Sequence, residues 1–257
     1  MTTKGLEERV ERLLDPGDYP GDERTRLVRI MLLLTTLPVP PGLEDVFPRY
    51  AEYRERFLET AEGEDGEALE EAFLTLYAHL HMHEAVYSTT ERSTMDEAGG
   101  YWAHAGGLSP ILKAGPWIGP ATVSADLGAG NGLQGLLLQW LDPHEKTIQV
   151  EISSRMVEIG KTLQAWLGIP ADRVEWVSGD VCDHPLDGID FIYLYRPVRP
   201  TTDRGRVFYE RLAGTLDHAA QEVIVFSIAD CLREFVSSRV EVFYHDGHLT
   251  CFRSRRK

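Results

Sequence analysis

The sequence predicts an α/β protein with a doubly wound, mostly parallel sheet and a helical amino-terminal region. From Pro120 onward, short β-rich segments alternate with helical segments, which is typical of a wound sheet. Before that point, the chain is rich in Glu, Arg and Leu at helical spacing and contains no convincing alternating strand. The two parts of the chain therefore predict different kinds of secondary structure.

Four helices are predicted in the amino-terminal region, where segments rich in Pro, Gly and Asp separate the helical runs. Their ranges are Gly5–Leu14, Glu23–Leu37, Leu43–Thr60 and Glu67–Tyr87. In the last range, apolar side chains recur at intervals of three and four residues, so they form one face of a helix. We expect that face to pack against a neighbouring element.

The remainder of the chain predicts strands that alternate with helices. The strands are Val123–Leu127, Thr147–Glu151, Val174–Val177, Asp190–Tyr195, Glu222–Ser227, Val240–Tyr244 and Leu249–Arg253. The helices are Gly132–Leu141, Arg155–Leu167, Asp203–Leu216 and Cys231–Val236. An Asp-Gly pair between the last two strands suits a tight turn, so we expect an antiparallel hairpin at this end.

The composition disfavours disordered, collagen-like and fibrous proteins. Hydrophobic residues make up 43% and charged residues 26% of the 257 residues, which is the balance of a globular chain. The net charge of 26 − 41 = −15 repels phosphate backbones and anionic lipids, which disfavours a nucleic acid or a membrane as partner. We expect a small molecule as the substrate, with a protein side chain as the alternative. The most hydrophobic run, Ile30–Leu34, is far shorter than the roughly 18 apolar residues of a membrane span.

The cysteines and the amino terminus predict a reducing compartment. Cys182, Cys231 and Cys251 are widely spaced and form no C-x-x-C pair, so we interpret them as reduced core thiols. The first residues contain no apolar stretch followed by a small-residue cleavage site. We therefore expect a cytoplasmic location.

A glycine-rich turn carries the strongest functional signal. The segment from Asp126 to Gly132 follows an apolar strand, precedes a helix and also contains Gly128 and Gly130. Glycine lets a ligand approach the backbone closely, and the start of the following helix presents unpaired N–H groups. The turn is therefore expected to hold a nucleotide-like ligand, with strand–helix packing alone as the alternative.

Acidic residues follow the next two predicted strands. Glu151 ends the second strand nineteen residues after Gly132, where an acid can accept hydrogen bonds from both hydroxyl groups of a ribose. Asp180 follows the third strand, where its carboxylate can accept from an adenine amine while the N–H of Val181 donates to a ring nitrogen. An Asp-containing turn without a ligand is the alternative for this segment.

The ADLGAGNG, QVEIS and SGDV segments resemble, in this order, the motifs of class I S-adenosyl-L-methionine-dependent methyltransferases, over about Tyr101 to Arg253. The resemblance implies a methyltransferase with a Rossmann-like sheet of seven strands, in which the last strand enters antiparallel. We expect residues 101–257 to form this domain and residues 1–100 to form a helical lid that shapes the acceptor pocket. The implied S-adenosyl-L-methionine contacts are Asp126, Gly128, Gly130, Gly132, Glu151, Asp180 and Val181.

Two other functions fit parts of this pattern. A nicotinamide-binding oxidoreductase also uses a glycine turn and an acid after the second strand, and Gly135 completes a loose G-x-G-x-x-G. Asp180 and the terminal hairpin favour the methyltransferase. A protein that keeps the cofactor fold for sensing or partner contact is the second alternative, and the intact cofactor motifs favour an enzyme over it.

Tyr101 and the loop after the fourth predicted strand are candidates for the reacting end of the site. Tyr101 lies where these methyltransferases often cover the methionine end of the cofactor, so its ring is a candidate contact of the sulfonium, with packing on the sheet as the alternative. Tyr195 is predicted to lie next to the transferring methyl group. Arg196 and Arg199 suit an anionic group of the substrate, or they pair with the protein's surplus acids.

Two further features bear on the chemistry. The loop after the fourth strand lacks an Asn-Pro-Pro-Tyr motif and a Pro-Cys nucleophile, which disfavours amino methylation of adenine or glutamine and methylation of cytosine C5. His79, His81 and His83 are close in sequence, and the first and third would share a helix face. They lack the H-E-x-x-H order, and His83 falls on the apolar face, so packing is favoured and no metal is predicted.

Overall fold

The computed structural model describes residues 2–81, 87–101, 107–229 and 231–255. The chain forms two compact units: Met1–Met82 with Ala105–Lys113, and His83–His104 with Ala114–Lys257. We call them the helical unit and the sheet unit. The expected division of function between residues 1–100 and 101–257 stays a prediction.

The helical unit contains a buried apolar face on its longest helix. Its elements are α1 (Thr3–Leu13), α2 (Glu23–Thr36), α3 (Tyr50–Thr60), α4 (Gly66–His81) and most of α6 (Ser109–Ala114). Leu69, Phe73, Leu76 and Leu80 form the predicted face of α4, and each is fully buried. Phe73 meets Phe57 of α3 edge-on, with ring centroids 5.9 Å apart. The helical character of the amino-terminal region is therefore confirmed.

The third predicted helix, Leu43–Thr60, is wrong in extent. Residues 44–49 form turns and a bend, and α3 begins only at Tyr50. Pro48 explains the break, because proline lacks an N–H and disfavours helical backbone in the residue before it. The Tyr50 hydroxyl then donates to Leu34 O at 2.6 Å, which ties the start of α3 to α2.

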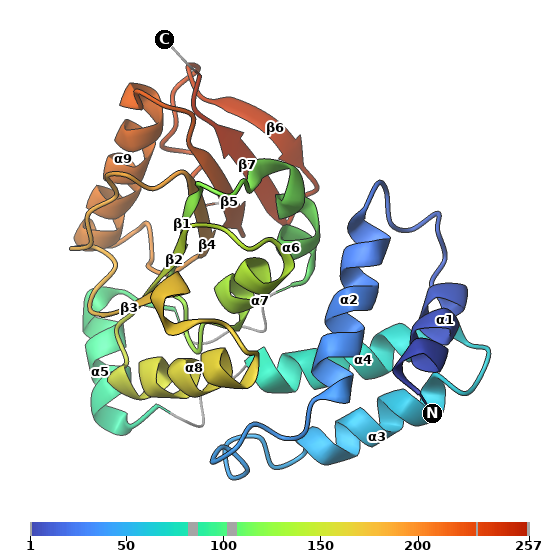
Figure 1. The fold of residues 1–257 in the computed structure, drawn as a ribbon. Helices are drawn as coiled ribbons and strands as arrows, with labels where there is room; N and C mark the ends of the chain where they lie inside the picture. Colours follow the sequence, from blue (N-terminus) through green and yellow to red (C-terminus); the bar gives the residue numbers. More distant parts are fainter. Residues whose placement is uncertain (1, 82–86, 102–106, 230, 256–257) are drawn as a thin grey trace. The chain divides into compact units, whose positions relative to one another are not determined.

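A seven-stranded sheet forms the centre of the sheet unit, in the order β3-β2-β1-β4-β5-β7-β6 (Figure 1). Strands β1 to β5 run parallel where they pair, and β7 is antiparallel to both β5 and β6. This order confirms the predicted fold class, including the terminal hairpin and the antiparallel last strand. The strands are β1 (Val123–Leu127), β2 (Lys146–Glu151), β3 (Val174–Ser178), β4 (Phe191–Tyr195), β5 (Ile224–Ile228), β6 (Glu241–His245) and β7 (Leu249–Arg253).

Both faces of the sheet are buried. Successive side chains of a strand point to opposite faces, so Ile192 packs in one hydrophobic core with Phe208, while Phe191 packs in a second core with Leu138. Leu138 and Phe208 come from α7 and α9. The helices of this unit are α5 (Thr89–Ala98), α7 (Leu133–Leu141), α8 (Ser154–Trp166) and α9 (Asp203–His218), with short 3-10 turns at Gly115–Trp117 and Ala171–Arg173.

One predicted helix of the sheet unit is wrong, and one helix of this unit was not predicted. The range Cys231–Val236 is not a helix: its described residues form a bend and turns. A six-residue helix is marginal by itself, and here Phe235 instead stacks on Tyr209 with ring centroids 5.4 Å apart. Conversely, α5 is a helix that the periodicity did not predict, since few of its side chains are apolar.

None of the helices in the described ranges is both long and apolar enough to cross a membrane.

Candidate functional site

The glycine-rich turn connects β1 to α7 at the carboxyl edge of the parallel strands, which is where ligands bind in wound sheets. Gly128, Gly130 and Gly132 have positive φ angles of 82°, 57° and 70°, a backbone region that other residues rarely adopt. The N–H groups of Gly128 and Ala129 both donate to Val150 O at 3.0 Å. The turn is therefore anchored to the end of β2.

The three glycines have different surroundings. A Cβ atom on Gly128 would lie 2.7 Å from Pro197 Cβ, and one on Gly132 would lie 2.5 Å from a ring carbon of Trp176. Among the described residues, a Cβ atom on Gly130 would come within 4 Å only of a methyl carbon of Met156, at 3.9 Å. Packing inside the protein therefore requires two of these glycines, whereas the described residues do not crowd Gly130.

Glu151 is the last residue of β2 and lies beside the turn. Its side chain is buried, and its carboxylate accepts the Gly130 N–H at 2.8 Å and the Ser153 N–H at 2.9 Å. The Ile152 N–H is a third backbone donor to it. A carboxylate offers about four acceptor positions, so Glu151 keeps capacity for a further donor. Burial raises the pKa of Glu151 to about 7, against the lowering effect of the backbone donors.

Asp126 provides a second buried carboxylate beneath the turn. It accepts the Gly135 N–H at 3.3 Å. Burial raises the pKa of Asp126 to about 7, and the nearby Glu151 contributes to the rise. Asp126 therefore supports the turn and the start of α7 from inside the protein.

The start of α5 lies beside Glu151, a neighbour that sequence reasoning missed. Glu91 and Ser88 form a reciprocal capping box, and Glu91 also accepts a hydrogen bond from the Ser153 hydroxyl. Tyr87 is buried next to these acids: burial raises its pKa, and Glu151 and Glu91 raise it further. The Ser-x-x-Glu pattern at 88–91 is a helix-start signal that could have revealed α5, but its contact with Ser153 has no sequence signature.

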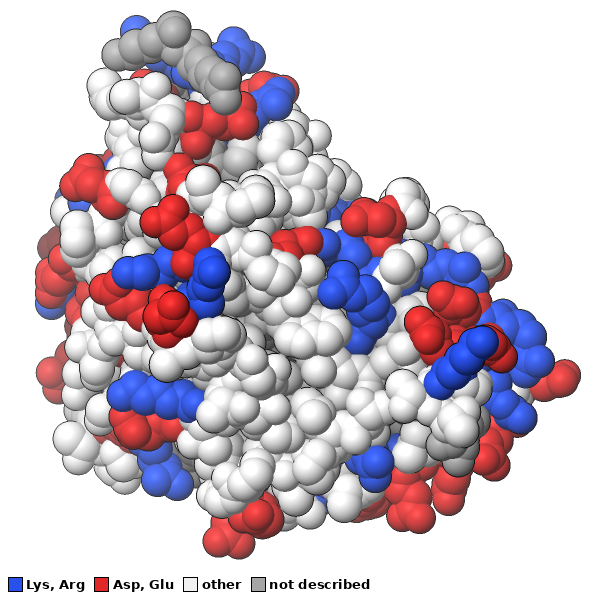
Figure 2. Space-filling view, viewed as in Figure 1, with Lys and Arg blue, Asp and Glu red and all other residues white. Residues whose placement is uncertain are grey.

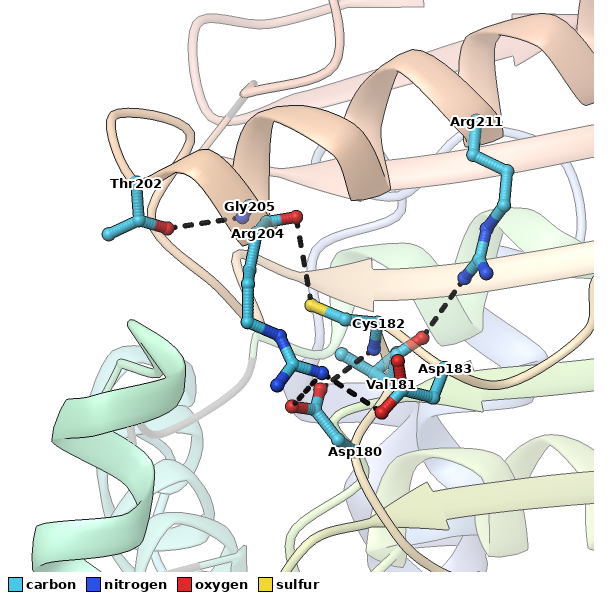
Figure 3. A network of polar contacts seen from close by, with 8 residues as sticks. All are labelled: Asp180, Val181, Cys182, Asp183, Thr202, Arg204, Gly205 and Arg211. Carbon is cyan, nitrogen blue, oxygen red and sulfur yellow. Dashed lines mark hydrogen bonds and ion pairs between the residues drawn. The ribbon is translucent and has the colours of Figure 1, made fainter.

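Asp180 follows β3 and belongs to the network of Figure 3. Its Oδ1 accepts the Cys182 N–H at 2.8 Å, and its Oδ2 lies 3.0 Å from Nη2 of Arg204. Val181 is buried in the core, and its carbonyl accepts from Arg211 at 3.3 Å. A cavity of about 460 Å³ adjoins this network and is lined by Cys182, Asp183, Asp203, Arg204 and Val207.

The loop after β4 brings Arg196, Arg199 and Tyr101 together. The guanidinium carbons of Arg196 and Arg199 lie 5.2 and 5.5 Å from the centroid of the Tyr101 ring, within cation–π distance. Arg196 also donates to Ala229 O at 3.1 Å. Within the described residues, Arg196 and Ala229 are the two non-glycine residues with positive φ, at 45° and 56°. Such strain clusters at functional sites.

The other candidates have contacts of their own or lie outside the described residues. The Tyr195 ring contacts His248 edge-on, at 6.0 Å between centroids. His79 Nε2 accepts the Arg49 N–H at 3.3 Å, and burial lowers the pKa of His79. His83 lies outside the described residues. Across the described ranges, no group of three or more His, Cys, Asp or Glu side chains is placed to hold a metal ion.

No family model and no curated protein matches the sequence. Among solved structures, the chain is similar to an RNA methyltransferase of Salinibacter ruber, with 18% identity over 57% of this chain and 87% of the other, at a TM-score of 0.43. It is also similar to an rRNA methylase of Streptococcus thermophilus, with 10% identity over 58% and 96%, at 0.42. A putative RNA methyltransferase of Pyrococcus horikoshii has 18% identity over 58% and 82%, at 0.42. The fold assignment of this chain rests on its strand order.

Proposed function

We propose that this chain, whose sheet has the class I methyltransferase topology, transfers a methyl group from S-adenosyl-L-methionine to a small molecule that carries an anionic group. One observation carries the cofactor assignment: all three predicted cofactor segments meet at Glu151. Its carboxylate accepts the Gly130 N–H at 2.8 Å, and its carbonyl accepts the Gly179 N–H at 2.9 Å. The glycine turn, the acid and the Asp180 segment are thus hydrogen-bonded neighbours at one sheet edge.

The residues at this edge fit the chemistry of the cofactor. Glu151 would accept the ribose hydroxyls, because its carboxylate keeps unused acceptor positions. Asp180 would accept the adenine amine, and the Val181 N–H would face the ring. Gly130 leaves space for the cofactor beside the turn. When bound, S-adenosyl-L-methionine supplies an electrophilic methyl group on a sulfonium, whose charge suits the ring of Tyr101.

Arg196 and Arg199 support an anionic acceptor. Both guanidinium groups flank Tyr101, and Nε of Arg196 is buried without a hydrogen-bond partner among the described residues. Guanidinium groups in this setting suit a carboxylate or phosphate on the acceptor. Tyr195 is proposed next to the methyl group, at the carboxyl end of β4. Figure 2 shows Lys and Arg side chains interspersed with Asp and Glu on the face in view.

Calorimetric titration tests the cofactor. We expect S-adenosyl-L-methionine and S-adenosyl-L-homocysteine to bind and NAD not to bind. Glu151→Ala and Asp180→Ala should each weaken binding by about tenfold or more, because each removes a hydrogen bond to a charged acceptor. Asp187→Ala, which removes an exposed acid before β4, is the matched control and should change nothing. Binding of NAD alone would identify a dehydrogenase and reject the proposal.

Transfer of a labelled methyl group tests the acceptor. We expect label in anionic metabolite fractions and none in neutral metabolites, RNA or protein. Arg199→Gln should lower kcat/KM for the anionic acceptor by about tenfold, the loss of one charge-assisted hydrogen bond, and leave S-adenosyl-L-homocysteine affinity unchanged. Labelled RNA or protein would reject a small-molecule acceptor. Cofactor binding with no labelled acceptor would favour a sensing protein.

A further inference from the structure

One arginine bridges two carboxylates beside the proposed adenine position. The same nitrogen of Arg204, Nη2, lies 3.0 Å from Asp180 Oδ2 and 2.9 Å from Asp183 Oδ2 (Figure 3). The other oxygen of Asp180 accepts the Cys182 N–H at 2.8 Å. Both oxygens of Asp180 therefore already have a donor. The donor of Oδ2 is the Arg204 side chain, which can move, whereas the donor of Oδ1 is a backbone N–H.

The two carboxylates differ in hydration. The side chain of Asp180 is 15% exposed, whereas that of Asp183 is 77% exposed and that of Arg204 is 51% exposed. A ligand amine can reach Asp180 only through its small exposed part, next to Arg204. Asp183 is open to water, so the guanidinium group can pair with it and no further charge loses its hydration.

The backbone around this bridge is held in place. Cys182 Sγ donates to Arg204 O at 3.9 Å, and burial raises the pKa of the Cys182 thiol to about 11, which keeps it a donor. The Thr202 hydroxyl caps α9 by accepting the Gly205 N–H at 3.1 Å. A Cβ atom on Gly205 would lie 1.9 Å from Arg199 O, so the start of α9 packs tightly on the β4 loop. The guanidinium can change partner, while the helix that carries it cannot shift freely.

We infer that Arg204 competes with the adenine amine for the exposed part of Asp180, and that Asp183 promotes cofactor binding by offering Arg204 a second partner when the amine takes its place. The inference rests on the proposed function. Asp183 and Arg204 are then positioning residues, since they act through Asp180 and Asp183 itself need not touch the ligand. Without Asp183, Arg204 pairs with Asp180 alone, and its guanidinium covers the small exposed part of Asp180 that the amine has to reach.

A double-mutant cycle tests this competition, with S-adenosyl-L-homocysteine as the titrant because it carries no sulfonium charge. Asp183→Asn should weaken binding by about three- to fivefold, the strength of a partly exposed ion pair. Arg204→Gln should bind at least as tightly as the wild type. The double variant should match Arg204→Gln, because Asp183 has no role once the competitor is gone.

Controls separate this effect from a structural one. Arg206→Gln removes an arginine of similar exposure on the same helix that pairs with Asp203 and Glu210, and it should leave affinity unchanged. All variants should keep the wild-type midpoint of chemical denaturation, as exposed substitutions do. Weakened binding by Arg204→Gln, or an Asp183→Asn effect that persists in the double variant, would overturn the inference alone. Failure of the wild type to bind would overturn the proposed function with it.

Discussion

Gly160→Ala is expected to lower the free energy of unfolding by about 2–3 kcal/mol, the cost of overpacking a core. Gly160 lies inside α8, where alanine would ordinarily be the better helix former. Here an added Cβ would lie 2.1 Å from Cη2 of Trp176 and 2.8 Å from Asn131 O in the glycine turn. Trp176 is held by its Nε1–H, which donates to Gln164 at 2.8 Å, and it also fills the space beside Gly132. The ring therefore cannot retreat without disturbing the turn.

Chemical denaturation measures this effect, and α9 provides its control. A Cβ atom on Gly214 would meet nothing within 4 Å, so Gly214→Ala should raise the free energy of unfolding by about 0.5–1 kcal/mol through helix propensity. Adding Trp176→Leu to Gly160→Ala should recover part of the loss by removing the opposing ring. Equal effects of the two alanine substitutions would show that Trp176 does not define the space around Gly160.

Glu151→Gln is expected to flatten the dependence of stability on pH. The folded-state pKa of Glu151, about 7, lies above its ordinary value of 4.5, so the folded state binds the proton more tightly than the unfolded chain. The stability from this group is therefore complete below pH 4.5 and is lost as the pH rises towards 7. Between pH 5 and pH 8, the variant should lose about 1–3 kcal/mol less than the wild type.

The same substitution should lower both the stability of the protein at pH 5 and its affinity for the ligand. At pH 5 the variant should be the less stable protein, because its amide nitrogen cannot accept from Gly130 or Ser153 as the carboxyl oxygens do. At pH 8, where the carboxyl group of Glu151 is ionised, the variant should also bind S-adenosyl-L-homocysteine about 10- to 100-fold more weakly, the loss of one or two hydrogen bonds to a charged acceptor. Denaturation at both pH values, with and without this ligand, measures both effects. Parallel pH profiles would contradict the burial of an ionisable Glu151.

Local patterns in the sequence were sufficient for the fold class and for the position of the glycine turn and Glu151 in it, while their role toward a cofactor stays a prediction. Strand–turn–helix alternation predicted the wound sheet, and the Asp-Gly pair predicted the terminal hairpin. The glycines of the β1 turn and Glu151 at the end of β2 were located correctly because parallel strands bring their carboxyl ends to one edge. Each of these features depends on residues that are close in sequence.

The contacts that shape the site depend on the tertiary structure. Arg204 pairs with Asp180, Glu91 bonds Ser153, and Tyr101 lies against two arginines of the β4 loop. The wrong helix prediction at 231–236 has the same cause, since Phe235 packs on Tyr209 of α9. Periodicity and turn chemistry report only what a segment prefers by itself. Which side chain of a distant segment meets a given carboxylate or ring is decided by how helices and loops pack around the sheet, and that packing leaves no local signal.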